Sequence, residues 1–342
     1  MRSSTSSSDP AHPGPRWGLA WLVALLVAAA LVGAVERYWR AQGYRPNIRD
    51  SAQLWSIERD RADRAGAKIP LVLLGASRIE FGIDMKLLAQ LLPRYRPLML
   101  AQNAHYPLAA LRDLAMDEAF HGVVLCDLEA NALVPAYRDM QQPLIDYHRH
   151  EWAPSWRVHR TLLTLWQKHA VVADPDLGVV ASAQRLLAGT APPRPEYFRF
   201  HADRSGDIDY SHTDVAAAKR HFAEVLQQSE QLHGDATPEA WRTGLPEVYE
   251  WTRRIQARGG SVIFYQSPTG ETLRRIDALR YPPAEYWDRF VADSPAPVID
   301  GGAEPALTQF QLPDDSHLDY RDKPGYTRAL VDVLVARGVV QR

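Results

Sequence analysis

From residue 69 onward, short apolar runs alternate with longer amphipathic segments. Continuous apolar runs bounded by Pro or Gly are typical of strands that are buried on both faces of a parallel sheet. Such runs predict strands over 70–75, 96–103, 122–129, 261–268 and 296–300. The helical segments between and after them cover 85–92, 107–120, 245–260, 282–291 and 324–338. This alternation predicts an α/β fold with three layers (α/β/α) around a parallel, flavodoxin-like sheet.

The segment from about 135 to 245 interrupts this pattern. It is rich in Trp, His, Arg and Pro, with helical patches at 160–172 and 214–232 and no convincing buried strand. We therefore expect a helical and loop insertion within an α/β domain that spans 69–342. Residues 36–68 read as a charged helical linker that leads into this domain.

The N-terminal part predicts a membrane segment. The run from Trp17 to Val35 is apolar and uncharged, and it is long enough to cross a bilayer core of about 30 Å. Residues 1–16 are rich in Ser and Pro, and we expect them to be disordered. Arginines flank the run on both sides, so the positive-inside rule gives little orientation. We expect a single-pass signal anchor in the inner (plasma) membrane, with the domain on the periplasmic side; the alternative is a signal peptide cleaved near Val32–Ala34.

Composition narrows the function classes. The 342 residues are 46% hydrophobic and 23% charged, which is an ordinary globular balance. A net charge of −2 gives no reason to expect a nucleic-acid partner. The single cysteine, Cys126, cannot form an internal disulfide. No Gly-x-Gly-x-x-Gly follows the first strand, and His148 and His150 lack a further ligand cluster, so we expect neither a cofactor nor a metal.

One serine occupies the position where an α/β sheet places its working groups. Ser77 follows the first predicted strand in the sequence Gly-Ala-Ser-Arg, at the carboxyl end of that strand. A serine hydroxyl needs a base and a group that orients the base. Asp314 and His317 stand three residues apart before the last predicted helix, with Asp315 as a competing acid. A serine at the end of the first strand, together with an acid and a histidine before the last helix, predicts a catalytic triad. The alternative is that these residues only form turns and caps.

This order of motifs resembles the SGNH (GDSL-like) hydrolase superfamily. The closest resemblance is to its bacterial membrane-anchored or periplasmic branches, which act in the acyl modification of exopolysaccharides or wall polymers. It covers about 69–135 and 245–340 and leaves the insertion unexplained. The resemblance implies that Ser77 is the nucleophile, His317 the base and Asp314 the orienting acid.

The resemblance also implies an oxyanion hole, and here the sequence departs from the family. Backbone N–H groups of Ser77 and Ala104 would contribute, but Ala104 stands where the family has glycine. The family's Gly-x-Asn-Asp motif is replaced by "CDLEANAL", in which Asn131 is the candidate donor and Glu129 is equally placed. The common Asp before the nucleophilic serine is also missing.

Three neighbours of these motifs are candidate substrate-binding residues: Arg78, Asn103 and His105. Arg78 has the alternative role of an ion-paired support. His105 would line the pocket or compete with His317 as the base.

These observations predict an envelope-tethered serine esterase or O-acyltransferase. Its expected substrate is an acyl ester, with acetyl esters of a polysaccharide favoured by the resemblance and the anchor. Membrane-bound envelope proteins are the expected partners. The competing hypothesis is a catalytically inactive SGNH-like module that binds a glycan or scaffolds an envelope assembly, and the two departures in the oxyanion motifs motivate it.

Overall fold

The computed structural model describes residues 17–64, 66–193, 197–233 and 237–342. The chain forms two compact units, Met1–Pro46 with His169–Arg194, and Asn47–Lys168 with Pro195–Arg342. The first is the smaller unit and the second is the larger unit. The tail over 1–16, for which we expected disorder, lies outside the described residues.

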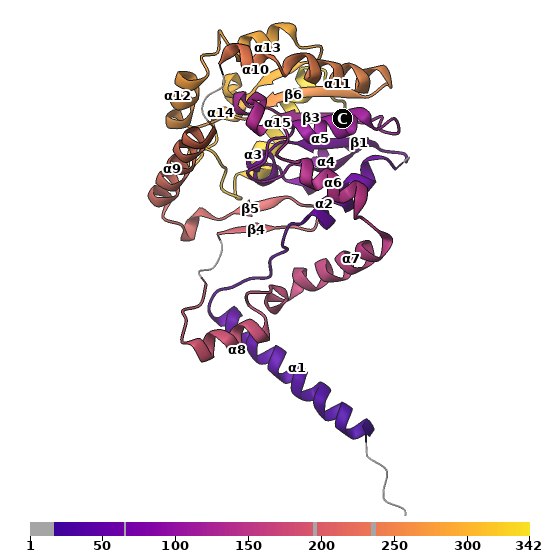
Figure 1. Ribbon diagram of the computed structural model, residues 1–342, viewed down its shortest axis with the longest axis vertical. Helices are drawn as coiled ribbons and strands as arrows, with labels where there is room; N and C mark the ends of the chain where they lie inside the picture. Colours follow the sequence, from indigo (N-terminus) through magenta and orange to yellow (C-terminus); the bar gives the residue numbers. More distant parts are fainter. Residues whose placement is uncertain (1–16, 65, 194–196, 234–236) are drawn as a thin grey trace, which may run out of the picture. The chain divides into compact units, whose positions relative to one another are not determined.

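The larger unit is built on a five-stranded parallel sheet (Figure 1). The strands, in spatial order, are β2 (Tyr95–Met99), β1 (Ile69–Leu74), β3 (Val123–Asp127), β6 (Ser261–Gln266) and β7 (Val298–Asp300). The predicted α/β class and parallel sheet are confirmed. Strand β2 ends earlier than predicted because the chain enters a tight turn at Gln102, where the Gln102 carbonyl accepts the N–H of His105 (3.0 Å).

Helices cover both faces of the sheet because its side chains alternate between two apolar clusters. Val72 and Leu74 of β1 belong to one cluster, whereas Leu71 and Leu73 belong to the other. The first cluster includes residues of α2 (Ala52–Ala62), α5 (Leu108–Met116), α11 (Leu245–Ala257) and α13 (Trp287–Asp293). The second includes residues of α3 (Ser77–Gly82), α4 (Met85–Leu91), α14 (Pro305–Thr308) and α15 (Lys323–Ala336).

Helix α2 shows that residues 36–68 are more than a linker. Trp55 of this helix is fully buried, and its indole Nε1–H donates to the Leu100 carbonyl (3.2 Å). Residues from Asn47 onward therefore belong to the folded core of the larger unit.

The insertion contains strands as well as helices, which corrects the expectation of helices and loops alone. Its helices in the larger unit are η2 (Pro135–Tyr137), α6 (Gln142–His150), α7 (Pro154–His169), η4 (Tyr210–His212), α9 (Val215–His233) and α10 (Pro238–Arg242). Strands β4 (Phe198–Phe200) and β5 (Gly206–Ile208) form an antiparallel hairpin between them. Three-residue strands are too short to show a period-2 pattern, so the sequence alone did not reveal them.

The smaller unit contains α1 (Trp17–Ala41), η3 (Val171–Ala173) and α8 (Val179–Ala188). By length and composition, α1 is able to cross a membrane, and it continues past the predicted end at Val35. Part of the insertion, 169–194, therefore packs with the N-terminal helix in a unit of its own.

The turn between β1 and α3 requires a glycine. At Gly75 φ is +155°, and a Cβ there would lie 2.9 Å from Cγ1 of Ile79 and 3.0 Å from Cβ of Asp127. Both neighbours are buried. The close approach places β3 and the start of α3 directly against the turn that precedes Ser77.

We expect Gly75→Ala to lower the free energy of unfolding by about 1–3 kcal/mol, because the added methyl group overpacks a buried turn. Denaturant unfolding of the full chain in detergent measures this change. Gly66→Ala is the matched control, since its Cβ would meet only the flexible end of Arg96, at 3.4 Å. Equal midpoints for the two variants would contradict the packing argument.

Candidate active site

The structure brings Ser77, His317 and Asp314 together. Nε2 of His317 lies 2.7 Å from Oγ of Ser77, and Nδ1 lies 2.8 Å from Oδ2 of Asp314. Ser77 is the first residue of α3, directly beyond β1. The other two residues lie in the loop between α14 and α15. Residues at opposite ends of the domain sequence therefore form one hydrogen-bonded relay.

The Asp314 carboxylate organises this loop. Its Oδ1 accepts the backbone N–H groups of Ser316 (2.9 Å) and His317 (2.7 Å), while Oδ2 faces the imidazole. Burial by itself raises the pKa of Asp314, but the hydrogen bonds and charge of His317 outweigh burial and lower that pKa below its ordinary value. Asp314 is therefore ionised at neutral pH.

The ionised carboxylate sets the tautomer of His317. A carboxylate can only accept, so Nδ1 of His317 carries the proton and donates to Asp314. Nε2 is then the acceptor for the Ser77 hydroxyl. This arrangement is able to take the proton from Ser77 and hold it on an imidazolium beside a negative charge.

Asp315, the competing acid, faces another way. Its carboxylate pairs with Lys219 of α9 (3.1 Å), and its carbonyl accepts the N–H of Gly270 (2.7 Å). Its φ of 68° is left-handed, a conformation that Asp tolerates better than most residues. It is Asp314, and not Asp315, that contacts His317.

Aromatic rings from the core and the insertion surround the imidazole. Phe81 of α3 and Phe222 of α9 meet the His317 ring edge-on, with centroids 6.3 and 6.0 Å away. Tyr210, also from the insertion, has a pKa raised first by burial and then by the charge of Asp314. These insertion residues were missed from the sequence, because nothing in their local pattern marks them as neighbours of His317.

The hairpin of the insertion holds the loop that follows His317. Nζ of Lys323 donates to the Gly206 carbonyl (2.7 Å) and to Asp207 (2.9 Å). The N–H of Tyr320 donates to the Ile208 carbonyl (2.9 Å). Strand β5 and the start of α15 are therefore fixed to each other on the His317 side of the site.

The turn after β2 carries Asn103, Ala104 and His105, and buried Gln141 ties it to the Ser77 turn. The Gln141 side-chain amide donates to the carbonyls of Gly75 (3.2 Å) and His105 (3.1 Å). Ala104 has φ of 60°, the left-handed conformation that a glycine would adopt without strain. Nδ1 of His105 donates to the Asn103 carbonyl (2.8 Å), and the base position beside Ser77 belongs to His317.

A buried arginine binds the end of β2 and the residues just after it. Arg204, in the hairpin loop, is fully buried and forms a two-pronged ion pair with Asp50 (2.8 and 2.7 Å). Its Nη1 also donates to the carbonyls of Met99 and Ala101. Burial raises the pKa of Glu80, whose Oε1 lies 3.6 Å from Arg204, well above the ordinary value. The insertion thus supplies the cation, Arg204, that binds the carbonyl groups at the end of β2 and just after it.

Arg78 is enclosed by internal partners. Its Nη1 pairs with Glu129 after β3 (2.9 Å), and its Nε donates to Oγ of Ser316 in the base loop (3.1 Å). Burial and then the charge of Glu129 raise the pKa of Asp277 to about 7, while Arg78 lowers it. These contacts favour the supporting role for Arg78 over the binding of substrate.

Ser267 and Asn131 lie in the segments that follow β6 and β3. Asp127 accepts the N–H (2.9 Å) and hydroxyl (3.0 Å) of Ser267, so Ser267 joins two strand ends. Asn131 is buried in η1 (Ala130–Leu133), where its carbonyl accepts the N–H of Val134. Within the described part of the chain, no hydrogen bond joins Asn131 to Ser77.

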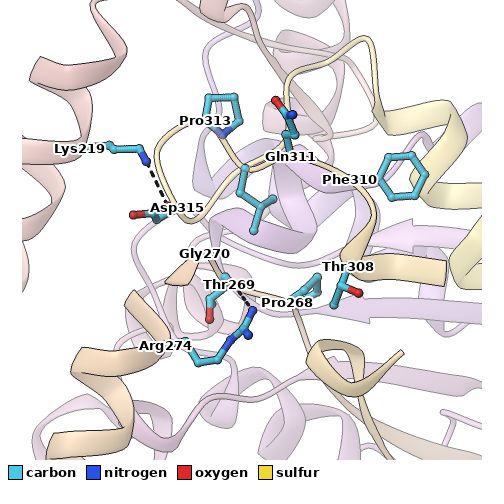
Figure 2. Close-up of a pocket in the computed structure, with 11 residues that line it drawn as sticks. Lys219, Pro268, Thr269, Gly270, Arg274, Thr308, Phe310, Gln311, Pro313 and Asp315 are labelled. Carbon is cyan, nitrogen blue, oxygen red and sulfur yellow. Dashed lines mark hydrogen bonds and ion pairs between the residues drawn. The ribbon is translucent and has the colours of Figure 1, made fainter. Parts of the chain in front are cut away.

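A cavity of about 420 Å³ borders the base loop at Pro313 and Asp315 (Figure 2). Its lining combines the cationic side chains of Lys219 and Arg274 with hydroxyl, amide and aromatic groups. Arg274 donates to the Thr269 carbonyl (2.7 Å), and Lys219 holds Asp315. The triad residues do not line this cavity.

Among the described residues, no cluster of three or more His, Cys, Asp or Glu is arranged to hold a metal ion.

The raised pKa of Asp277 predicts a pH-dependent stability. The folded state binds this proton more tightly than the unfolded state, so its contribution is present below pH 4 and is lost as pH rises towards 7. Relative to the wild type, Asp277→Asn should gain stability between pH 4.5 and 7.5, by about 1.4 kcal/mol per unit of pKa shift. Denaturant unfolding of the wild type and the variant at the two pH values measures the difference in the free energy of unfolding. Exposed Glu285→Gln is the control, and an equal gain in both variants would contradict the assignment to burial.

Comparison with models of known protein families gives no match to the chain. Comparison with curated protein sequences also gives no match. No family membership is therefore assigned, and the chemistry of the site is inferred from its geometry.

Proposed function

We propose that the protein is an envelope-tethered serine esterase or O-acyltransferase with a three-layer, SGNH-like α/β/α domain. The relay from Asp314 through His317 to Ser77, at the carboxyl end of β1, is the observation that carries this proposal. A serine within 2.7 Å of an imidazole that an ionised carboxylate orients has the parts required for acyl transfer.

In the proposed reaction, Oγ of Ser77 attacks the carbonyl carbon of an acyl ester while Nε2 of His317 takes the hydroxyl proton. The tetrahedral intermediate collapses when His317 returns that proton to the leaving alcohol oxygen, which leaves an acyl group on Ser77. Water or a sugar hydroxyl then loses a proton to Nε2 of His317 and attacks the acyl carbon. The second tetrahedral intermediate collapses when the bond to Oγ of Ser77 breaks and His317 returns the proton to that oxygen, which releases the product and restores the free serine. With water as the acyl acceptor the protein is an esterase, and with a sugar hydroxyl as the acceptor it is a transferase. The same three residues catalyse both reactions.

The oxyanion hole is proposed to use backbone and side-chain donors. As the first residue of α3, Ser77 has an N–H that the helix does not use. Ala104 stands in a turn that Gln141 fixes against Gly75, which supports its N–H as a second donor. Asn131 is proposed as the third.

A polysaccharide ester is the proposed substrate class. The cavity beside the base loop offers Lys219, Arg274, Thr269 and Gln311, a set of cationic, hydroxyl and amide groups that suits an acidic or acetylated sugar. Phe310 adds an aromatic ring to its lining. With α1 as an anchor, we place the catalytic unit on the periplasmic side of the inner membrane.

A fluorophosphonate probe tests the nucleophile in the full chain in detergent. We expect covalent labelling at Ser77, found by peptide mass spectrometry, and its loss in Ser77→Ala and His317→Ala. Asp314→Asn should slow acetyl-ester turnover about 10³- to 10⁴-fold, because the amide no longer holds the required tautomer. Asp322→Asn is the matched control, since it changes an acid between the base loop and α15 whose side chain makes no capping hydrogen bond; its rate should stay near that of the wild type.

Folded protein without labelling or turnover would overturn the enzyme proposal. The glycan-binding or scaffolding module would then be favoured, because a strained Ala104 at the glycine position and the absence of Gly-x-Asn-Asp weaken the oxyanion hole. Binding of acetylated polysaccharide by the unreactive protein is the measurement that would support that second function.

Asn131→Ala tests the third oxyanion donor separately. If its amide donates to the developing oxyanion, kcat should fall about 100-fold with little change in KM, because the bond strengthens only in the transition state. Steady-state kinetics with a chromogenic acetate ester measures the two constants. A variant with unchanged kcat would remove Asn131 from the site and leave the two backbone donors.

A further inference from the structure

Helix α8 of the smaller unit presents an apolar surface that none of the residues the structure describes covers. Val180, Leu186 and Leu187 are 71%, 84% and 89% exposed. At 3.6 residues per turn, the valines and leucines of this helix, together with one of its alanines, fall within an arc of about 120°. The arc consists of Val179, Val180, Ala183, Leu186 and Leu187. The surfaces of soluble proteins seldom expose adjacent leucines to this extent. We therefore expect these side chains to contact an apolar environment.

The contacts between α8 and α1 fix the position of α8 along the axis of α1. Nε1 of Trp39 donates to Oγ of Ser182 in α8 (3.0 Å). Trp39 also packs with Val171, Val172 and Leu177, the residues that lead into α8, and Val35 of α1 packs against the same cluster. Val35 is the last residue of the uncharged run, so this cluster begins where the apolar part of α1 ends.

Polar contacts hold the same junction together. The carboxylate of Glu36 accepts the backbone N–H groups of Val171 (3.1 Å) and Val172 (2.9 Å). Arg40 pairs with Glu36 (2.6 Å) and donates to the His169 carbonyl (2.8 Å). The segment before α8 is thus bound to the first charged turn of α1 and cannot move away from it without losing these bonds.

The bilayer dimensions identify the environment. From Trp17 to Val35, α1 rises about 28 Å, which matches a hydrocarbon core of about 30 Å. Tyr38 and Trp39 then lie at the headgroup level, where amphipathic aromatic rings are favoured. Helix α8, which starts next to them, begins at the same level and lies across the end of α1 (Figure 1).

The side chains of α8 suit that level. The helix contains no acidic residue, and its one cation, Arg185, lies outside the apolar arc and donates to the Asp176 carbonyl. A short amphipathic helix of this kind buries its apolar face at the boundary between headgroups and acyl chains.

We propose that α8 is an interfacial helix that lies in the leaflet from which α1 emerges, with Val180, Leu186 and Leu187 among the acyl chains. The partner is the lipid bilayer itself. The smaller unit then holds the membrane at two places, the transmembrane helix and the interfacial helix. This proposal is independent of the chemistry at Ser77.

Site-specific fluorescence in vesicles tests the proposal with the full chain. Leu187→Cys is labelled with an environment-sensitive fluorophore and reconstituted into vesicles of phosphatidylethanolamine and phosphatidylglycerol. Cys126 is buried, so the wild type gives the labelling background. We expect a blue-shifted emission that falls when lipids with doxyl-labelled acyl chains are included and that resists quenching by aqueous iodide.

Gln184→Cys is the matched control, because residue 184 is exposed on the same helix but lies outside the arc. Its probe should respond to iodide and not to the doxyl lipids. A Leu187 probe that responds to iodide as Gln184 does would overturn the proposal, and since the vesicles contain no other protein, it would leave the arc to a protein partner. Equal quenching of both probes by lipid would also overturn it, because the helix would then lack the proposed sidedness.

Discussion

The carboxylate of Asp314 is the group on which the site depends. It accepts two backbone N–H groups within its own loop and one from the imidazole of His317, so one side chain shapes the loop and aims the ring. Its charge survives burial because each of these donors stabilises the ionised form. Without it the loop would lose its turn, and His317 would lose both its tautomer and its direction towards Ser77.

The insertion is a structural part of this site, although its sequence resembles an accessory cap. Gln141 joins the two turns that follow β1 and β2, and Arg204 supports the end of β2 from a fully buried position. Phe222 meets the imidazole of His317 edge-on. Through Gln141 and Arg204 the insertion satisfies carbonyl groups of the core, so it forms part of the frame that holds the site.

The smaller unit, by contrast, leaves an apolar surface exposed. Glu36 accepts backbone N–H groups of the segment before α8, and Trp39 donates to Ser182 within α8. The leucines of α8 remain exposed. In water such a surface is unfavourable, whereas at a lipid interface it contributes to binding. In the proposed arrangement, the two contacts of this unit with the bilayer limit how far it can tilt away from the membrane.

The sequence by itself determined the α/β class, the approximate positions of the five sheet strands and the apolar helix, because strand periodicity and the length of an apolar run are local signals. From their spacing it also offered Asp314 and His317 as candidate partners. It left Asp315 open as the acid and His105 open as the base. Only the tertiary structure decided between them, since the choice depends on which side chain reaches a ring that the chain brings from the other end of the domain. It likewise decided that Arg78 is enclosed by Glu129 and that Phe222 and Arg204 belong to the site. Such long-range contacts leave no periodic trace in the sequence, because packing, rather than spacing along the chain, selects them.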